Sequence, residues 1–401
     1  MPNEKEVFGM PKVLISFKTK STTAISRSAR GIVVMILKNE ETNTMKHFKI
    51  NDVTDIPEKG LTDKNIDLIK KCLLGTPLRI LVYTIPLDSV SDAKIKQSNV
   101  LKEIANLKWN YICAPTATGS DHEDLASWIK TQRNNKHKTF KAVLANTDAD
   151  DKGIINFCTG NIKVNNPDYV KEDTVANVAI VGESMIADSV IAKDTQQPYL
   201  YYTATEYTAR IAGILAGLAL DRSATYYVLK EVAGVETYED IDTLIDKGQL
   251  LLVDEGDGDG VKIARACNSL TTFTTDVGQD FRYIKIVECV DMITDDIRDT
   301  FKADYVGKVI NDYNHKMNFI SAIMVYFSGL KGNVLDNSPT VQNYVDIDET
   351  SQRNYAILHG DDVGKMSIQQ IREYNTGTNV FLIGRITPVN AMEDLTVEFT
   401  M

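Results

Sequence analysis

Apolar and polar residues alternate near both ends of the chain, over residues 13–18 and 395–400. The apolar positions are Val13, Ile15 and Phe17 in the first segment and Leu395, Val397 and Phe399 in the second. A period of two predicts a β-strand with one buried face. A strand at a chain end has open hydrogen-bonding edges, so it can pair within its own subunit or with a neighbouring chain. The pattern alone leaves both possibilities open.

The two ends of the chain differ in charge. Residues 1–38 contain seven Lys or Arg and two Glu, a net charge of +5, whereas the last thirteen residues contain three acidic and no basic residues, a net charge of −3. Opposite charges favour two segments that lie side by side and penalise the pairing of like segments. Because exposed ion pairs contribute little affinity, we expect these charges to influence register and partner choice.

The first half of the chain predicts an α/β arrangement. An apolar run at 31–37 predicts a fully buried strand, and 47–50 predicts a second strand. A helix is expected over 60–74, ending at Gly75. The strands expected next are 79–85, 109–114, 140–145 and 154–157, and the helices between them are 92–106 and 121–133. This alternation is typical of parallel strands covered by helices.

The second half mixes longer helices with short strands. An amphipathic helix is predicted over 203–220. Glycine inside a helix costs about 1 kcal/mol relative to alanine, so its small residues indicate that another backbone packs closely against it. These residues are Ala209, Ala212, Gly213, Ala216 and Gly217. We also expect a hairpin of 250–254 with 261–266, strands at 283–287 and 379–386, and helices at 295–302, 316–330 and 367–374.

These elements predict an α+β protein with a mixed-sheet core domain, built from both chain ends, and an inserted α/β domain. We expect a polar linker at 193–198 after the insert. The expected divisions are an N-terminal strand arm (1–20), a first part of the core (21–76), the insert (77–195), a C-terminal core domain (199–392) and a C-terminal strand arm (393–401).

Composition narrows the class of protein. The 401 residues are 43% hydrophobic and carry a formal net charge of −11, which argues against a general nucleic-acid binder. The longest apolar stretch, 211–220, is too short to span a bilayer, so no membrane insertion is expected. The first residues lack the pattern of a secretory signal, which predicts a cytoplasmic protein. Five widely spaced cysteines without a CxxC pair predict buried reduced thiols.

Two segments deserve comparison with functional sites. Residues 114–123 combine hydroxyl side chains with His122, which would suit a catalytic site, but the same pattern is more typical of a helix start with an Asp or Ser N-cap. The acidic loop 254–260 resembles a calcium-binding loop, yet the twelfth position counted from Glu255 is Ala266 rather than a bidentate Glu. A glycine-rich hairpin turn, able at most to bind cations weakly, is the better interpretation.

Other catalytic and cofactor signatures are missing from the sequence. It contains neither a GxxxxGK[ST] nor a GxGxxG phosphate loop after the strands of the insert, and no GxSxG nucleophile motif. The histidines are scattered and form no HExxH or i, i+4 pair: His47, His122, His137, His315 and His359. We therefore expect no catalytic residues, no cofactor and no metal site.

The order and spacing of several motifs resemble the contractile phage tail sheath proteins, most closely the short sheaths of Gram-positive phages and phage-tail-like bacteriocins. The resemblance covers the N-terminal arm and most of residues 199–401 and is vaguer over the insert. The segments that carry it are 209–218, 223–227, 263–266, 268–272, 284–288, 295–297 and 305–308.

This resemblance implies a structural protein rather than an enzyme. Subunits of this family form hexameric rings stacked helically around a tail tube and exchange N- and C-terminal strands with neighbours. The implied partners are other copies of the chain, a tail tube protein, and baseplate and tail terminator proteins. The resemblance also implies that the chain assembles in the host cytoplasm and ends in a virion tail or phage-tail-like particle. The alternative is a soluble α/β nucleotide-binding enzyme with an added C-terminal domain.

Overall fold

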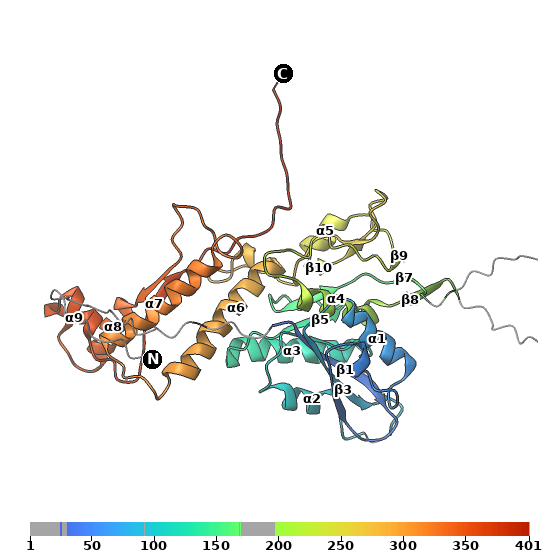
Figure 1. Ribbon diagram of the computed structural model, residues 1–401, viewed down its shortest axis with the longest axis horizontal. Helices are drawn as coiled ribbons and strands as arrows, with labels where there is room; N and C mark the ends of the chain where they lie inside the picture. Colours follow the sequence, from blue (N-terminus) through green and yellow to red (C-terminus); the bar gives the residue numbers. More distant parts are fainter. Residues whose placement is uncertain (1–24, 26–29, 92, 168, 170–196, 401) are drawn as a thin grey trace, which may run out of the picture. The chain divides into compact units, whose positions relative to one another are not determined.

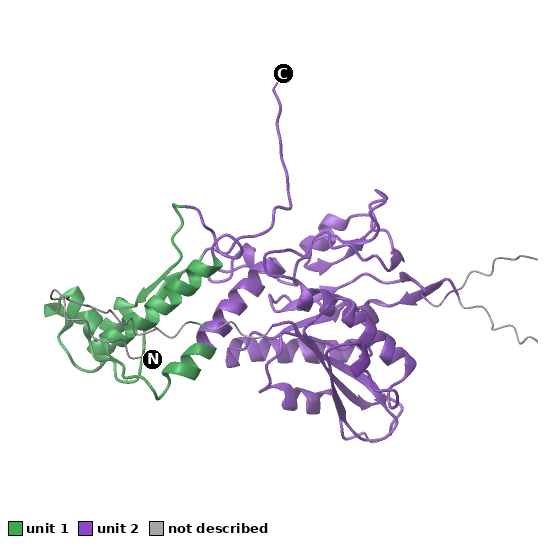
Figure 2. Cartoon of the chain, in the orientation of Figure 1, with its two compact units in different colours: residues 1–26, 299–330, 339–386 green, residues 27–298, 331–338, 387–401 purple. Residues whose placement is uncertain are grey.

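A computed structural model describes residues 25, 30–91, 93–167, 169 and 197–400 (Figure 1). The predicted strand at 13–18, with Val13, Ile15 and Phe17, lies outside the described residues, as does most of the expected linker at 193–198. The chain forms two compact units (Figure 2). The larger unit contains residues 27–298, 331–338 and 387–401, and the smaller unit contains residues 1–26, 299–330 and 339–386.

A seven-stranded sheet organises the larger unit, with strand order β10-β6-β5-β4-β1-β3-β2. Strand β2 runs antiparallel to β3, and the other neighbours pair in parallel. The strands are β1 (Ile32–Glu40), β2 (Lys46–Ile50), β3 (Arg79–Pro86), β4 (Tyr111–Cys113), β5 (Lys141–Ala145), β6 (Ile154–Phe157) and β10 (Gln249–Leu250). The predicted parallel arrangement of the first half is thus confirmed.

Helices cover both faces of this sheet, and each face has its own apolar core (Figure 1). Helices α1 (Asp63–Leu73) and α4 (Ala204–Gly217) pack on one face, and α2 (Gln97–Ile104) and α3 (Gly119–Lys136) pack on the other. Strand β1 sends Val33, Met35 and Leu37 to the first core and Ile32, Val34 and Ile36 to the second. Burial on both faces explains why β1 is apolar at consecutive positions.

The expected boundary between residues 76 and 77 passes through this sheet. Strands β1 and β2 precede that boundary, and β3 to β6 follow it, yet all belong to one sheet. Residues 32–38 of β1 pair in parallel with residues 79–85 of β3. The α/β part therefore begins with β1 rather than at residue 77. The reason is that β1 is a central strand, which needs a partner on each edge.

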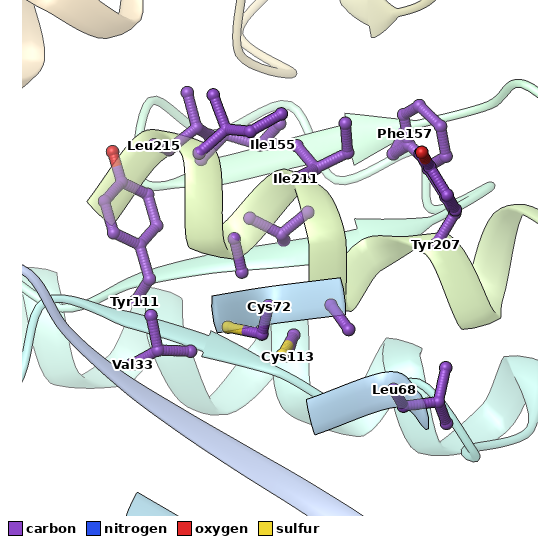
Figure 3. Close-up of a cluster of buried hydrophobic side chains, with 14 of the residues drawn as sticks. Val33, Leu68, Cys72, Tyr111, Cys113, Ile155, Phe157, Tyr207, Ile211 and Leu215 are labelled. Atoms are coloured by element: carbon purple, nitrogen blue, oxygen red, sulfur yellow. The ribbon is translucent and has the colours of Figure 1, made fainter. Parts of the chain in front are cut away.

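Helix α4 lies across the first face of the sheet (Figure 3). Its side chains Ile211 and Leu215 lie near Ile155 of β6, and the rings of Tyr207 and Phe157 are 6.2 Å apart. All of these side chains are buried, which confirms that the helix packs against a core. The predicted amphipathic character is wrong, because every residue from 207 to 215 is buried and the helix is covered on all sides there.

Smaller elements complete the larger unit. A three-stranded antiparallel sheet joins β7 (Ile162–Asn165) to β8 (Tyr199–Tyr202) and β9 (Val232–Gly234). Helix α5 (Ile241–Asp246) precedes the predicted hairpin, which is confirmed as β11 (Leu252–Val253) paired with β12 (Lys262–Ile263). Short 3-10 helices occur at Val53–Asp55 and Gln279–Arg282.

The predicted strand at 283–287 is wrong, because this segment forms the beginning of helix α6 (Ile284–Thr300). A π-helical turn, Phe301–Tyr305, follows α6 in the smaller unit. The smaller unit continues with α7 (Tyr313–Leu330), β13 (Tyr344–Ile347), α8 (Glu349–Leu358), a 3-10 helix (Val363–Lys365), α9 (Ile368–Glu373) and β14 (Leu382–Arg385). Strands β13 and β14 pair antiparallel and form a two-stranded sheet.

Candidate inter-subunit surface

The alternating C-terminal segment is exposed. Leu395, Val397 and Phe399 are 89%, 54% and 87% exposed, although they are large and apolar. Residues 395–400 pair with no strand in the described part of the chain. A strand with an apolar face gains stability only when that face is covered and its edges are paired. The predicted site residues at this end are thus available to another chain.

The segment before it is held to the larger unit. The amide of Val389 donates to the carbonyl oxygen of Val334 at 3.0 Å, and Leu335 forms an antiparallel bridge with Pro388. Lys285 of α6 donates from Nζ to the carbonyl oxygen of Val389 at 2.8 Å. The exposed residues therefore follow directly on a fixed stretch of backbone.

The sheet of β13 and β14 has two open edges within the described residues. It pairs residues 344–347 with residues 382–385, and each strand has one partner there. An isolated two-stranded sheet is marginally stable in water, and additional strands stabilise it. Ile383 of β14 is 54% exposed, so this sheet also presents apolar surface. The sequence pattern did not indicate that these two strands could accept an additional strand from another chain.

Residues 114–123 contain the start of helix α3, as the N-cap interpretation predicted. Thr118 is the N-cap of α3 and forms a capping box with Asp121, whereas we expected Asp or Ser at this position. His122 is fully buried, and both ring nitrogens bond to backbone. Nδ1 accepts from the amide of Ala145 at 3.1 Å, and Nε2 donates to the carbonyl oxygen of Ala114 at 3.1 Å. The imidazole therefore joins the ends of β4 and β5.

Two carboxylates of the acidic loop 254–260 pair with a lysine of its own hairpin. Lys262 Nζ lies 2.7 Å from a carboxylate oxygen of Glu255 and 2.7 Å from one of Asp257. Hydrogen bonds to Asp257 and Glu255 raise the pKa of Lys262, so it stays protonated. Oxygens that bond to an ammonium group are poorly placed to bind a cation. No group of three or more His, Cys, Asp or Glu in the described residues could hold a metal ion.

The five cysteines are free thiols, as predicted. Four of them are buried, and Cys158 is partly exposed. Burial raises the pKa of Cys158 to about 11 and that of Cys289 to about 12, so these thiols are protonated at neutral pH. Cys72 of α1 and Cys113 of β4 lie near each other in the core beneath α4 (Figure 3). Their role is to pack as small apolar side chains.

Among the described helices, none has both the length and the apolar character needed to cross a membrane. Residues 91–269 match the phage tail sheath protein central domain, and residues 276–401 match the phage tail sheath C-terminal domain. The tail sheath protein of Clostridium phage phiCD119 is 30% identical to this chain over 98% of the chain and 99% of its own length. The chain belongs to the phage tail sheath family.

Solved structures share the fold of this tail sheath protein. The sheath tail protein from Desulfitobacterium hafniense matches with a TM-score of 0.61 at 18% identity, over 84% of this chain and 94% of its own. The contracted helical sheath of the anti-feeding prophage matches with a TM-score of 0.62 at 13% identity, over 98% of this chain and 99% of its own. The resemblance found in the sequence is confirmed, and the family is one of structural proteins rather than enzymes.

Proposed function

We propose that this chain is the repeating subunit of a contractile tail sheath, which polymerises as stacked hexameric rings around a tail tube. The 30% identical relative is a phage tail sheath protein, and one solved structure of the same fold is a helical sheath in its contracted state. Another structure of this fold belongs to a baseplate of the anti-feeding prophage. These relatives favour partners of two kinds, namely other copies of the chain and a baseplate, and the proposal adds a tube protein at the centre of the sheath.

The single observation that carries the assembly model is the exposure of Leu395, Val397 and Phe399 on an alternating segment. An exposed apolar strand is stabilised when it joins the edge of another sheet. The two-stranded sheet of β13 and β14 is the acceptor that we propose in a neighbouring copy. The N-terminal segment with Val13, Ile15 and Phe17 would be exchanged in the same way, so that each subunit both lends and receives strands.

Contraction in this proposal uses stored conformational energy instead of catalysis. Each subunit stays nearly rigid while its contacts with neighbours change, and the exchanged strands keep the lattice connected. The extended sheath is a kinetically trapped state until a signal from the baseplate lets one ring rotate. Contraction then drives the tube through a cell envelope. We place residues 77–195, together with the β1 and β2 strands of the same sheet, on the outer surface.

Assembly takes place in the host cytoplasm in this proposal, and a tail terminator protein closes the end of the finished sheath. The C-terminal domain, residues 199–392, supplies the remaining contacts between copies. No cofactor and no metal ion enter the mechanism.

Two substitutions in the C-terminal segment test the proposal. Val397→Asp places a charge on the face that is buried after exchange, so tubes and rings should be lost in electron micrographs. Thr396→Asp adds the same charge to the polar face and should leave assembly intact. Both variants should keep the circular dichroism spectrum of the unmodified chain. Normal tubes from Val397→Asp would refute strand exchange, and a small oligomer from the unmodified chain would favour the enzyme alternative.

A further inference from the structure

Glu393 is buried inside its own subunit. Its side chain is 7% exposed, although it lies only two residues before Leu395, which is 89% exposed. Glu393 Oε1 accepts hydrogen bonds from Ser223 Oγ at 2.9 Å and from Thr225 Oγ1 at 2.8 Å. Thr225 Oγ1 in turn accepts from the amide of Ala266 at 2.9 Å. The carboxylate thereby joins the end of the chain to two loops of the larger unit.

Arg265 hydrogen-bonds one of two consecutive carboxylates and lies close to the other. Arg265 donates from Nη2 to Asp394, and its Nε lies 3.9 Å from Glu393 Oε2. Hydrogen bonds between charged groups are stronger than those between neutral groups. Asp394 is largely exposed, so its ion pair contributes less than the buried contacts of Glu393.

These contacts change the interpretation of charge at the C-terminus. In the sequence, the last thirteen residues have a net charge of −3, which we expected to favour pairing with the basic N-terminal segment. Glu393 and Asp394 bind within their own subunit, so Glu398 is the one carboxylate of the three that lies beyond the held segment. The carboxylates of Glu393 and Asp394 therefore stabilise the position of this segment within its own subunit.

We propose that the C-terminal segment has two parts, a root at 387–394 that Glu393 holds to the larger unit, and a donated arm at 395–400. The inference rests on the proposed strand exchange. Backbone bonds at Val389, the contact from Lys285 and the side chain of Glu393 hold the root along its length. Glu393 is a positioning residue, because it fixes the point at which the arm leaves the subunit. A mechanical force on the arm is therefore transmitted to the larger unit.

Hydrogen exchange of the root tests this role in the full-length chain. The Val397→Asp background keeps the subunits unassembled, so neighbouring copies do not protect the root. Adding Glu393→Ala should increase the exchange rates of amides at 389–394 by roughly tenfold, as expected from the loss of hydrogen bonds to a charged group. Glu398→Ala in the same background removes a carboxylate from the arm and should leave these rates unchanged.

The outcomes for the root and for strand exchange are separable. Unchanged exchange at 389–394 in the Glu393→Ala chain would overturn the root, whether or not the arm is exchanged. If Val397→Asp forms normal tubes, strand exchange fails, and the root is then tested by the same comparison on those tubes. Faster exchange in both the Glu393→Ala and Glu398→Ala chains would also overturn the assignment to Glu393.

Discussion

A β-carbon built on Gly213 of α4 would lie 2.0 Å from the carbonyl oxygen of Cys72, at the end of α1. The contact is between backbones, so side-chain rotation cannot relieve it. Gly217, one turn later, has the same relationship to the carbonyl oxygen of Gly75, at 1.9 Å. The glycines in α4 thus allow the two helices to touch, which is the close approach that the small residues predicted.

Gly213→Ala should therefore destabilise the larger unit, even though alanine favours helices. Overpacking costs about 1–3 kcal/mol and more where backbone must move, which outweighs the gain of about 1 kcal/mol in helix propensity. Urea unfolding followed by circular dichroism measures the difference. The matched control is Gly329→Ala in α7, where an added β-carbon meets no atom within 4 Å of the described chain. The control should be neutral or slightly stabilising, and equal stability of both variants would contradict the argument.

Glu288 holds α6 to the sheet through a buried ionic cluster. Its carboxylate accepts from Arg30 at 2.5 Å and from the Tyr111 hydroxyl at 2.5 Å, and it lies 3.1 Å from Lys141 Nζ. Burial by itself would raise the pKa of Glu288, but the charges of Lys141 and Arg30 and the hydrogen bond from Tyr111 outweigh it and lower the pKa to about 2. The ionised form is therefore the one that the fold stabilises.

Glu288→Gln should lower the free energy of unfolding at neutral pH by about 3–5 kcal/mol, because the half-buried Arg30 loses its carboxylate partner and the buried Lys141 keeps only Asp291. A depressed carboxyl pKa stabilises the fold above its ordinary value of 4.5, and this contribution is lost as the pH falls towards about 2. The stability difference between the two chains should thus shrink over that range. Urea unfolding at a series of pH values measures it. Glu398→Gln, on the exposed arm, should show no such difference, and a constant difference for Glu288→Gln would argue against the cluster.

The α/β sheet could be predicted from the sequence because its strands are buried on both faces and its helices alternate with them. The segment 283–287 shows where such reasoning fails. Its apolar β-branched residues suit a strand, yet Glu288, Asp291 and Asp295 follow at spacings of three and four, which places them on one face of a helix. In the structure, Glu288 and Asp291 of this helix both form ion pairs with Lys141 of β5. The helix is thus joined to the sheet by an ionic contact between residues far apart in the sequence.

The candidate surface was predictable only in part. Alternation identified Leu395, Val397 and Phe399 as a strand with one apolar face, but a local pattern does not say which chain supplies the partner. Glu393 gave no signal, because a carboxylate near a chain end resembles an exposed charge. Its partners Ser223 and Thr225 are distant in the sequence, and the fold alone brings them together.

His122 offers a test of whether a buried polar residue serves structure or chemistry. Its ring bonds to the amide of Ala145 and the carbonyl oxygen of Ala114, and that oxygen also accepts from the amide of Ala117 at 3.0 Å. His122→Leu would therefore leave the Ala145 amide buried and unpaired, whereas the Ala114 carbonyl would keep one partner. The free energy of unfolding should fall by about 1–3 kcal/mol, the cost of one unpaired buried backbone group. His47→Leu, on the exposed side of β2, should change it by less than about 0.5 kcal/mol.

Assembly gives the second readout for His122. Below its unfolding temperature, the His122→Leu chain should still form tubes in electron micrographs, because the ring lies inside the larger unit and bonds to that unit's own backbone. A variant that kept full stability but lost tube formation would show that His122 acts in a step beyond folding. Loss of stability with normal tubes at low temperature is the result expected of a residue that ties β4 to β5.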